Sequence, residues 1–398
     1  MTTVHNSTDC PVCRLTDTAV LIETPPVPVY CNVLWPTHAD ALAAPTGEMR
    51  LCWCRECGHF FNAAFRPELM GGYDQQYENS LHYSEKFRSY AQGLAKRLVE
   101  RYDLRDKHVV DIGCGKGDFL LLLCAMGHNR GIGYDHSYEE REIDPALKSR
   151  VRFIRDFYPA RHPQNTADFI CCRQVLEHLQ HPVAFLQEIR KGIDGKKDMV
   201  VFFEVPNVMY TLKDLGIWDL IYEHYSYFSA HSLARAFTSA GFRVASLEDA
   251  FAGQYLTIEA LPVTDTATAD ENGGAGEIQE INSYVEVFAE KYHEKVASWS
   301  RQLAEMKRLG KKVVVWGGGS KGIMFLNLMR SDAAISYVVD LNRHKHGRFV
   351  PVTGQEVVPP EFLKDYRPDA VITMNPIYRE EIANKLQSMN VTAECVAA

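Results

Sequence analysis

A carboxylate and three glycines at fixed spacing are the residues of this chain best suited to hold a ligand. An apolar run ends at Asp111, and a glycine-rich turn then leads into a second apolar run. The glycines of that turn are Gly113, Gly115 and Gly117. This order predicts a buried strand, a tight turn and the start of a helix. The spacing differs from those of dinucleotide-binding and phosphate-binding loops, so we expect a crevice at the carboxyl end of a strand for another nucleotide-like ligand.

Three more strands are predicted downstream, over residues 131–135, 151–156 and 167–172. Asp135 ends the first of them, where a carboxylate can accept hydrogen bonds from a ribose diol. This series resembles the cofactor-binding half of class I S-adenosylmethionine (SAM) methyltransferases. The resemblance implies that Asp156 meets the adenine amine and that the residues contacting SAM are Asp111, Gly113, Gly115, Gly117, Asp135, Asp156 and Gln174.

Four cysteines form two C-x-x-C pairs separated by forty residues. The pairs are Cys10 with Cys13 and Cys54 with Cys57, and Cys31 and Cys52 are alternative ligands. Four thiolates complete a closed tetrahedral shell, so we predict a structural Zn²⁺ and no catalytic one. The segment between the pairs is expected to be a small excursion rich in strand or loop. Disulfides are disfavoured if the protein is cytosolic.

A histidine next to a carboxylate is the main candidate for acid–base chemistry. His224 follows Glu223 in an aromatic segment beyond the predicted strand 200–205, and such a pair suits a general base near neutral pH. An aromatic core segment with a hydrogen-bonded histidine is the alternative. His178 is a competing candidate for the base, and the alternative to that role is packing in a helix. Tyr77 and His82 are candidate contacts to the substrate or the cofactor.

The composition sets outer bounds on function. The chain has 398 residues, enough for two or three domains, and 46% of them are apolar. A net charge of −8 argues against a nucleic-acid partner, and no apolar run reaches the roughly 20 residues that span a membrane. No secretory signal is evident. We therefore expect a cytoplasmic protein, a monomer or homodimer, with no membrane partner.

The last third of the chain repeats the strand–glycine–helix pattern. Small and polar residues over 266–277 predict an exposed linker, and a long amphipathic helix is expected after it. A strand from residue 312 then runs into three glycines, Ser320 and Lys321. Helix N-terminal amides and a lysine favour an anion. We predict that Ser320 and Lys321 bind a phosphate group of the substrate.

Taken together, these segments resemble the family of SAM-dependent sugar C-methyltransferases, which modify nucleotide-linked 4-keto sugars for antibiotics. The family signature Tyr-His-Glu-His, followed by Ser-Tyr-Phe-Ser, is matched here over residues 222–229 with one histidine missing. The resemblance implies that Tyr222, Glu223 and His224 lie at the methyl acceptor. It also implies an α/β fold in which a class I SAM methyltransferase domain lies between a small zinc module and a second Rossmann-like domain. We expect the zinc module over 1–72, the methyltransferase domain over 73–265, a linker and helix over 266–310, and a Rossmann-like acceptor-binding domain over 311–398.

Two departures from that family concern the methyl acceptor. The family's Gly-Gly-Ser-x-Arg run is replaced here by residues 252–257, which include Gln254 and Tyr255. The Trp-x-x-His element of the family has no clean match around residues 84–88. We predict acceptor contacts from Asn207, Gln254 and Tyr255. The acceptor is expected to be a small molecule, and a nucleotide-linked keto sugar is the leading candidate. An O-methyltransferase of another natural-product intermediate and a non-catalytic SAM-binding scaffold are the alternatives.

Overall fold

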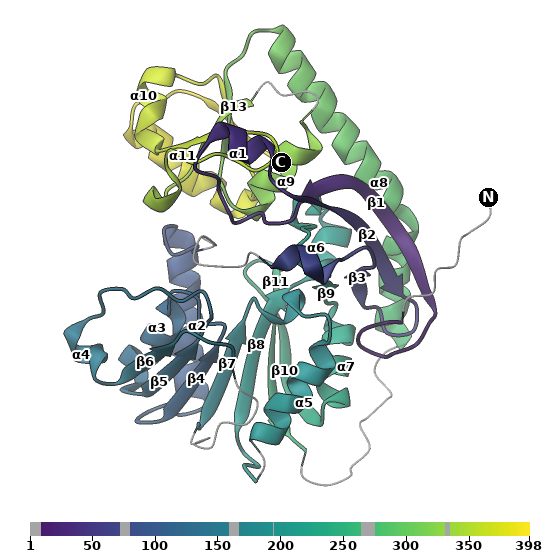
Figure 1. Ribbon diagram of the computed structural model, residues 1–398, viewed down its shortest axis with the longest axis vertical. Coiled ribbons are helices and arrows are strands. Elements are labelled where there is room, and N and C mark those ends of the chain that lie inside the picture. Colours follow the sequence, from purple (N-terminus) through teal and green to yellow (C-terminus); the bar gives the residue numbers. More distant parts are fainter. Residues whose placement is uncertain (1–8, 72–79, 159–166, 194, 264–274, 331–334) are drawn as a thin grey trace.

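A computed structural model describes residues 9–71, 80–158, 167–193, 195–263, 275–330 and 335–398. Tyr77 lies outside these residues, as does most of the predicted linker. The described chain forms three sheets, one for each predicted region (Figure 1). No helix in this described part is long and apolar enough to cross a membrane.

The N-terminal sheet is antiparallel, with strand order β1-β2-β3-β9. Its elements are β1 (Thr18–Pro28), α1 (His38–Leu42), β2 (Thr46–Cys54), β3 (Phe60–Asn62) and the 3-10 turn η1 (Pro67–Met70). The fourth strand, β9 (Ser226–Tyr227), comes from the aromatic segment around His224 and pairs with β3. The N-terminal module is therefore completed by the same segment that carries the candidate base.

The central domain has a seven-stranded sheet in the order β10-β11-β8-β7-β4-β5-β6. Its strands are β4 (His108–Ile112), β5 (Arg130–Tyr134), β6 (Val151–Ile154), β7 (Phe169–Arg173), β8 (Val200–Pro206), β10 (Phe242–Ala250) and β11 (Tyr255–Pro262). Strand β11 runs antiparallel to both its neighbours. Strands β4 and β7 are parallel neighbours, and the order in which strands are added to the sheet reverses between them. A ligand is therefore expected at the carboxyl ends of these two strands.

Helices cover both faces of this sheet. They are α2 (Glu85–Arg101), α3 (Asp118–Gly127), α4 (Pro145–Lys148), α5 (Pro182–Gly192), α6 (Val208–Lys213) and α7 (Ala230–Ser239), with 3-10 turns η2 (Leu176–His178) and η3 (Ile217–Asp219). Helices α2 and α3 share one apolar cluster with the sheet, and α5 and α7 share another. The predicted strands at 131–135, 151–156, 167–172 and 200–205 are confirmed to within a few residues.

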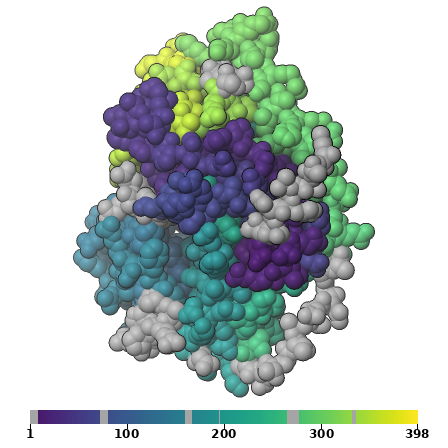
Figure 2. Space-filling view, turned by 45° about the vertical axis from the view of Figure 1, so that its right-hand side comes forward, coloured from purple at the N-terminus to yellow at the C-terminus, as the bar shows by residue number. Residues whose placement is uncertain are grey.

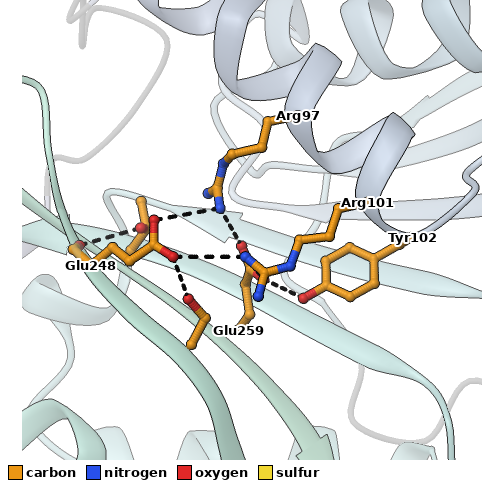
Figure 3. Close-up of polar contacts among 7 residues, drawn as sticks. Arg97, Arg101, Tyr102, Glu248 and Glu259 are labelled. Atoms are coloured by element: carbon orange, nitrogen blue, oxygen red, sulfur yellow. Dashed lines mark hydrogen bonds and ion pairs between the residues drawn. The ribbon is translucent and has the colours of Figure 1, made fainter.

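A buried carboxylate fixes α2 against the sheet (Figure 3). Glu259 on β11 has a side chain that is only 2% exposed, and it lies 2.7 Å from Arg97 and 3.1 Å from Arg101. Tyr102 donates a hydrogen bond to the same carboxylate, which together with burial raises the pKa of the phenol. Because these contacts hold the carboxyl end of α2, its amino end is fixed over the ligand side of the domain.

The C-terminal domain has a five-stranded parallel sheet in the order β14-β13-β12-β15-β16. Its strands are β12 (Val313–Trp316), β13 (Ile335–Val339), β14 (Glu356–Val358), β15 (Ala370–Thr373) and β16 (Glu394–Ala397). Its helices are α8 (Ala275–Arg308), α9 (Ser320–Leu328), α10 (Leu363–Tyr366) and α11 (Arg379–Ser388), with 3-10 turns η5 (Arg343–Lys345), η6 (Pro360–Phe362) and η7 (Pro376–Tyr378). The second Rossmann-like domain is therefore present. The long helix begins at Ala275, inside the run expected to be linker.

The N-terminal module joins the other two domains. In Figure 2 it lies across one face of the molecule between the central and C-terminal domains. Trp35 and Phe349 exchange backbone hydrogen bonds of 2.9 and 2.8 Å, and the Val352 amide donates to Ala41. One apolar cluster contains side chains from β1, η3, α8 and α9. The three regions therefore share a core, which fixes their relative positions.

Candidate active site

A cavity of about 920 Å³ lies between the central and C-terminal domains. The residues that line it include Gln174, Glu177, His178, Asp219, His224, Tyr255, Ser320, Lys321 and Asn375. Six of the side chains predicted from sequence therefore meet at one cavity: Gln174, His178, His224, Tyr255, Ser320 and Lys321. The C-terminal domain closes one side of it, where the Glu381 carboxylate accepts hydrogen bonds from the Ser84 hydroxyl and from the amides of Glu85 and Lys86.

Two histidines and a carboxyl group gather on the catalytic side of this cavity. The rings of His178 and His224 are in edge contact at 4.9 Å, and Nδ1 of His178 hydrogen-bonds to the carbonyl of Glu223 at 3.0 Å. Glu177, His178 and His224 each contribute one nitrogen or oxygen atom to a group whose members lie within 4.8 Å of one another. A proton can therefore be taken up and stabilised at this point.

Burial disfavours the charged form of each member of this group. Burial lowers the pKa of His224 well below its ordinary value, and the charges of His178 and Lys321 lower it further. Burial also lowers the pKa of His178 to about 4 and raises that of Glu177 well above the usual range. His224 is thus a neutral imidazole able to accept a proton. Because Lys321 disfavours further positive charge nearby, we interpret the group as a proton-transfer site and not a cation site.

The two neighbours of His224 in the predicted signature point elsewhere. The Tyr222 side chain is fully buried outside the cavity lining, where its hydroxyl accepts a hydrogen bond from the Arg66 amide at 2.8 Å. Oε2 of Glu223 accepts a hydrogen bond from the Cys31 amide at 3.1 Å. These placements correct the expectation that both side chains lie at the acceptor. Ile221 lines the cavity instead, and Glu177 is the carboxyl group next to His224.

The first glycine turn follows β4 and opens towards the cofactor side. Asp135 binds this turn, because its carboxylate accepts hydrogen bonds from the Gly115 amide and from Ser137. Gly115 has a φ of 53°, and no described atom lies within 4 Å of the position that a Cβ would occupy. A ligand can therefore approach this backbone closely. Gly117 precedes α3 as its N-cap, and exposed Asp156 follows β6 at the same edge of the sheet.

A buried network connects this cofactor edge with the cavity. Gln174 has the left-handed φ of 56°, a strained conformation for this residue type. Its amide donates to the carbonyl of Glu204, and its side chain donates to the Glu204 carboxylate, which also accepts hydrogen bonds from Arg173 and Tyr90. Gln174 is thereby held between the glycine turn and the cavity. Asp111 is 2% exposed beneath the turn, and burial raises its pKa to about 7.

Two predicted acceptor contacts have structural roles in the described chain. Asn207 caps α6 and also donates to Asp249 and the carbonyl of Gly253. Gln254 forms a reciprocal pair of amide hydrogen bonds with Asn375, at 2.7 and 3.1 Å, across the domain boundary. Neither Asn207 nor Gln254 lines the cavity, whereas Asn375 does. His82 also lies outside the lining, 3.9 Å from Asp118.

The cavity also contains residues that sequence reasoning missed. Asp219 lies only five positions before His224, and Asn375 lies two positions after β15. A polar residue after an apolar run was the available signal for Asn375. Asp219 had no such signal, since the segment between α6 and β9 has little regular structure.

The four predicted zinc ligands come together in the N-terminal module. The Sγ atoms of Cys10 and Cys57 are 3.5 Å apart, as are those of Cys13 and Cys54, and all four lie within 4.8 Å of one another. A tetrahedral Zn²⁺ with bonds of about 2.3 Å needs sulfur atoms about 3.8 Å apart. The geometry therefore fits that ion. Cys31 and Cys52 do not belong to the group.

Comparisons with known proteins identify two domains. Residues 83–247 match the family described as a methyltransferase domain, and residues 261–396 match the one described as a C-methyltransferase C-terminal domain. The C-methyltransferase NovU of Streptomyces niveus is 24% identical over 354 residues, which are 84% of this chain and 80% of NovU. This similarity extends across both matched domains.

Other relatives match a smaller part of the chain. A tRNA U34 carboxymethyltransferase of Sulfurimonas denitrificans is 26% identical over 116 residues, which are 26% of this chain and 37% of that protein. The solved structure of CalO1, a methyltransferase in calicheamicin biosynthesis in its SAH-bound form, is 19% identical with a TM-score of 0.34. That match covers 43% of this chain and 54% of CalO1.

Proposed function

We propose that this chain, a divergent member of the SAM-dependent C-methyltransferase family, methylates a carbon atom of a nucleotide-linked keto sugar with His224 as the general base. The observation that carries the proposal is a neutral, buried imidazole on the wall of a cavity between the methyltransferase and C-terminal domains. A carbon next to a ketone must lose a proton before it can attack a methyl group, and a neutral imidazole is suited to accept it.

The fit of the methyl donor is supported by the first glycine turn. SAM supplies an electrophilic methyl group on its sulfonium. Gly115 leaves room for close approach, and Asp135 lies beside it at the end of β5, where a ribose diol would be bound. Gln174 lies between that turn and the cavity, so the donor and acceptor sites are expected to meet there.

The chain's own residues would position and deprotonate the acceptor. His224 would accept the proton from the acceptor carbon, and the neighbouring Glu177 side chain would stabilise the new imidazolium. Tyr255 on β11 and Ser320 on α9 both line the cavity, and we propose them as contacts to the sugar and its nucleotide. Holding both substrates in one closed cavity replaces a chance encounter by a fixed geometry.

A structural Zn²⁺ is the second part of the proposal. The Cys10, Cys13, Cys54 and Cys57 thiols would bind it as thiolates. Strand β9 of the His224 segment pairs with β3 of this module. By stabilising the module, the metal would therefore help to position His224 without taking part in the reaction.

Hydrogen exchange at the acceptor carbon tests the assignment of the base. The enzyme is incubated in D₂O with SAH and a thymidine-diphosphate 4-keto sugar, and loss of the proton next to the ketone is followed by NMR. We expect wild-type protein to exchange it and His224→Asn to slow exchange by about 100-fold or more. His128→Asn is the matched control, since His128 is 75% exposed and its φ of 56° suits asparagine.

The outcomes separate the alternatives. Exchange at the wild-type rate in His224→Asn would contradict the base assignment. No exchange with any keto sugar, together with methyl transfer to a hydroxyl or carboxylate, would favour an O-methyltransferase. Failure to bind SAM in calorimetry would favour a scaffold.

A further inference from the structure

Lys321 comes from the C-terminal domain but points at the methyltransferase domain. It lies in the first turn of α9, directly after the second glycine turn. Its Nζ is 3.1 Å from Oδ1 of Asp219, and the two side chains are 18% and 13% exposed. Both residues line the cavity. The ammonium group is therefore presented to the space that the acceptor would occupy.

Packing between the domains holds this lysine in place. The ring of Trp218, next to Asp219, makes an edge contact with the ring of Phe325 on α9, with centroids 4.9 Å apart. Both side chains are almost completely buried. One buried aromatic contact beside their ion pair thus holds Lys321 and Asp219 in position.

One backbone amide of the second glycine turn is bonded to a side chain of the protein. The Gly318 amide donates to the Asp340 carboxylate at 2.8 Å. Lys345 donates to the Gly318 carbonyl at 3.0 Å and lies 3.6 Å from the same carboxylate. Lys321 takes no part in this cluster. Lys321 faces Asp219 instead, so within the described residues it is not bonded to the same group as the Gly318 amide.

The reaction centre needs a hydrogen-bond donor for the acceptor's oxygen. Tyr222 lies outside the cavity lining, and its hydroxyl is bonded to the Arg66 amide. Removal of a proton next to a ketone places negative charge on the ketone oxygen, and a preorganised donor there is usually the largest single contribution to catalysis. Lys321 is close enough to His224 for its charge to lower the pKa of that imidazole.

We propose that Lys321 is the electrophilic catalyst of the methyl-acceptor site, donating a hydrogen bond to the acceptor's ketone oxygen as the enolate forms. This inference rests on the proposed keto-sugar function. Asp219 holds the ammonium group when no acceptor is bound. The C-terminal domain would then take part in catalysis as well as in substrate binding.

The bonds balance without another reactant. His224 takes the proton, the C–H electron pair forms the carbon–carbon double bond, and the carbonyl π pair moves onto the oxygen beside Lys321. In the second step the oxygen pair re-forms the carbonyl, and the double-bond pair attacks the methyl group of SAM. The sulfur keeps the electrons of its bond to that methyl group and leaves as the neutral thioether SAH.

Steady-state kinetics of Lys321→Met with a thymidine-diphosphate 4-keto sugar test this inference. We expect kcat to fall by about 100- to 1000-fold while the KM of the sugar changes little. The acid limb of the pH profile of kcat/KM should move to higher pH, because a charge that lowers the pKa of His224 is removed. The other charged or titratable groups near His224 are unchanged in this variant: Glu177 and His178 on η2, Asp219 on η3, and Glu223.

Three further variants make the result decisive. Lys312→Met is the matched control, because Lys312 precedes the same strand, β12, at its opposite end and donates to the Tyr366 carbonyl. Its kcat should equal that of wild type. Asp219→Asn keeps the ammonium group, so its kcat should fall much less than that of Lys321→Met. If Lys321→Met is unstable, the double variant Asp219→Asn/Lys321→Met leaves no unpaired charge and carries the same expectation.

Each remaining outcome overturns the inference in a recognisable way. A raised KM with unchanged kcat in Lys321→Met would make the lysine an anchor for the diphosphate. Unchanged kcat and KM would make it an interdomain ion pair only. Wild-type protein that methylates no keto sugar would instead overturn the proposed function, and the catalytic role of Lys321 with it.

Discussion

Replacing Gly115 by alanine tests whether the methyl donor lies against the first glycine turn. Gly115 and Gly113 have φ values of 53° and 68°, so alanine is strained at both. A Cβ at Gly113 would lie 2.2 Å from Cγ2 of Val175, whereas no described atom lies within 4 Å of one at Gly115. The two variants therefore separate a collision with the ligand from a collision with the protein.

The expected magnitudes follow from this geometry. Left-handed backbone costs alanine about 1–2 kcal/mol, so both variants should lose at least that much stability. Gly113→Ala should lose a further 1–3 kcal/mol or so because Val175 must move. Gly115→Ala should instead lose affinity for SAM, because the new methyl group enters the ligand's space. An overpacking cost of about 1–3 kcal/mol there corresponds to a roughly 5- to 150-fold higher Kd.

Calorimetric titration with SAM and thermal unfolding without ligand measure the two effects separately. The account expects Gly115→Ala to be the more stable variant and yet to bind SAM at least 5-fold more weakly than wild type. Wild-type SAM affinity in Gly115→Ala would refute the reasoning, because the Cβ would then point away from the bound ligand.

Three other predictions concern stability, pH and metal. Glu259→Gln should lower the free energy of unfolding by about 2 kcal/mol, less than the loss of a fully buried ion pair, because its arginine partners are 32% and 39% exposed. Glu248→Gln is the control, and thermal unfolding should show no comparable loss of stability there, because the Glu248 side chain is 52% exposed. Because the folded protein lowers the pKa of His178 to about 4, the stability that depends on this residue should fall as pH drops from about 6.5 towards 4, so over this range the Tm of wild type should decrease relative to that of His178→Asn, which keeps Glu177 and Asp111; parallel Tm curves would contradict the assignment. Cys13→Ser should reduce bound zinc, measured by elemental analysis, whereas Cys395→Ser in the C-terminal domain should retain it; equal zinc contents would contradict the four-cysteine site.

The sequence predicted the parts of the fold that depend on local patterns. Apolar runs ending in a glycine turn or an acid gave the strands around Asp111 and Asp135, because burial and backbone geometry restrict those positions strongly. The spacing of the four cysteines likewise predicted that they form one group. These features need no knowledge of which segments lie side by side.

What could not be predicted depends on contacts between distant segments. Tyr222 and Glu223 lie next to His224 in sequence, but the chain between α6 and β9 is irregular, so no periodicity tells which side chains face the cavity. Glu223 turns to the Cys31 amide, almost two hundred residues away in sequence. Lys321 was interpreted from its own glycine turn, and only the packing of α9 on η3 shows that it faces Asp219.

The position of a transferred methyl group tests the central claim most directly. The enzyme is incubated with trideuteromethyl-SAM and a set of thymidine-diphosphate 4-keto sugars, phenols and small carboxylic acids, and NMR locates the label. We expect a trideuteromethyl group on a sugar carbon next to the ketone, absent from the same reaction with His224→Asn. Label on oxygen, or transfer to a non-sugar acceptor alone, would contradict it.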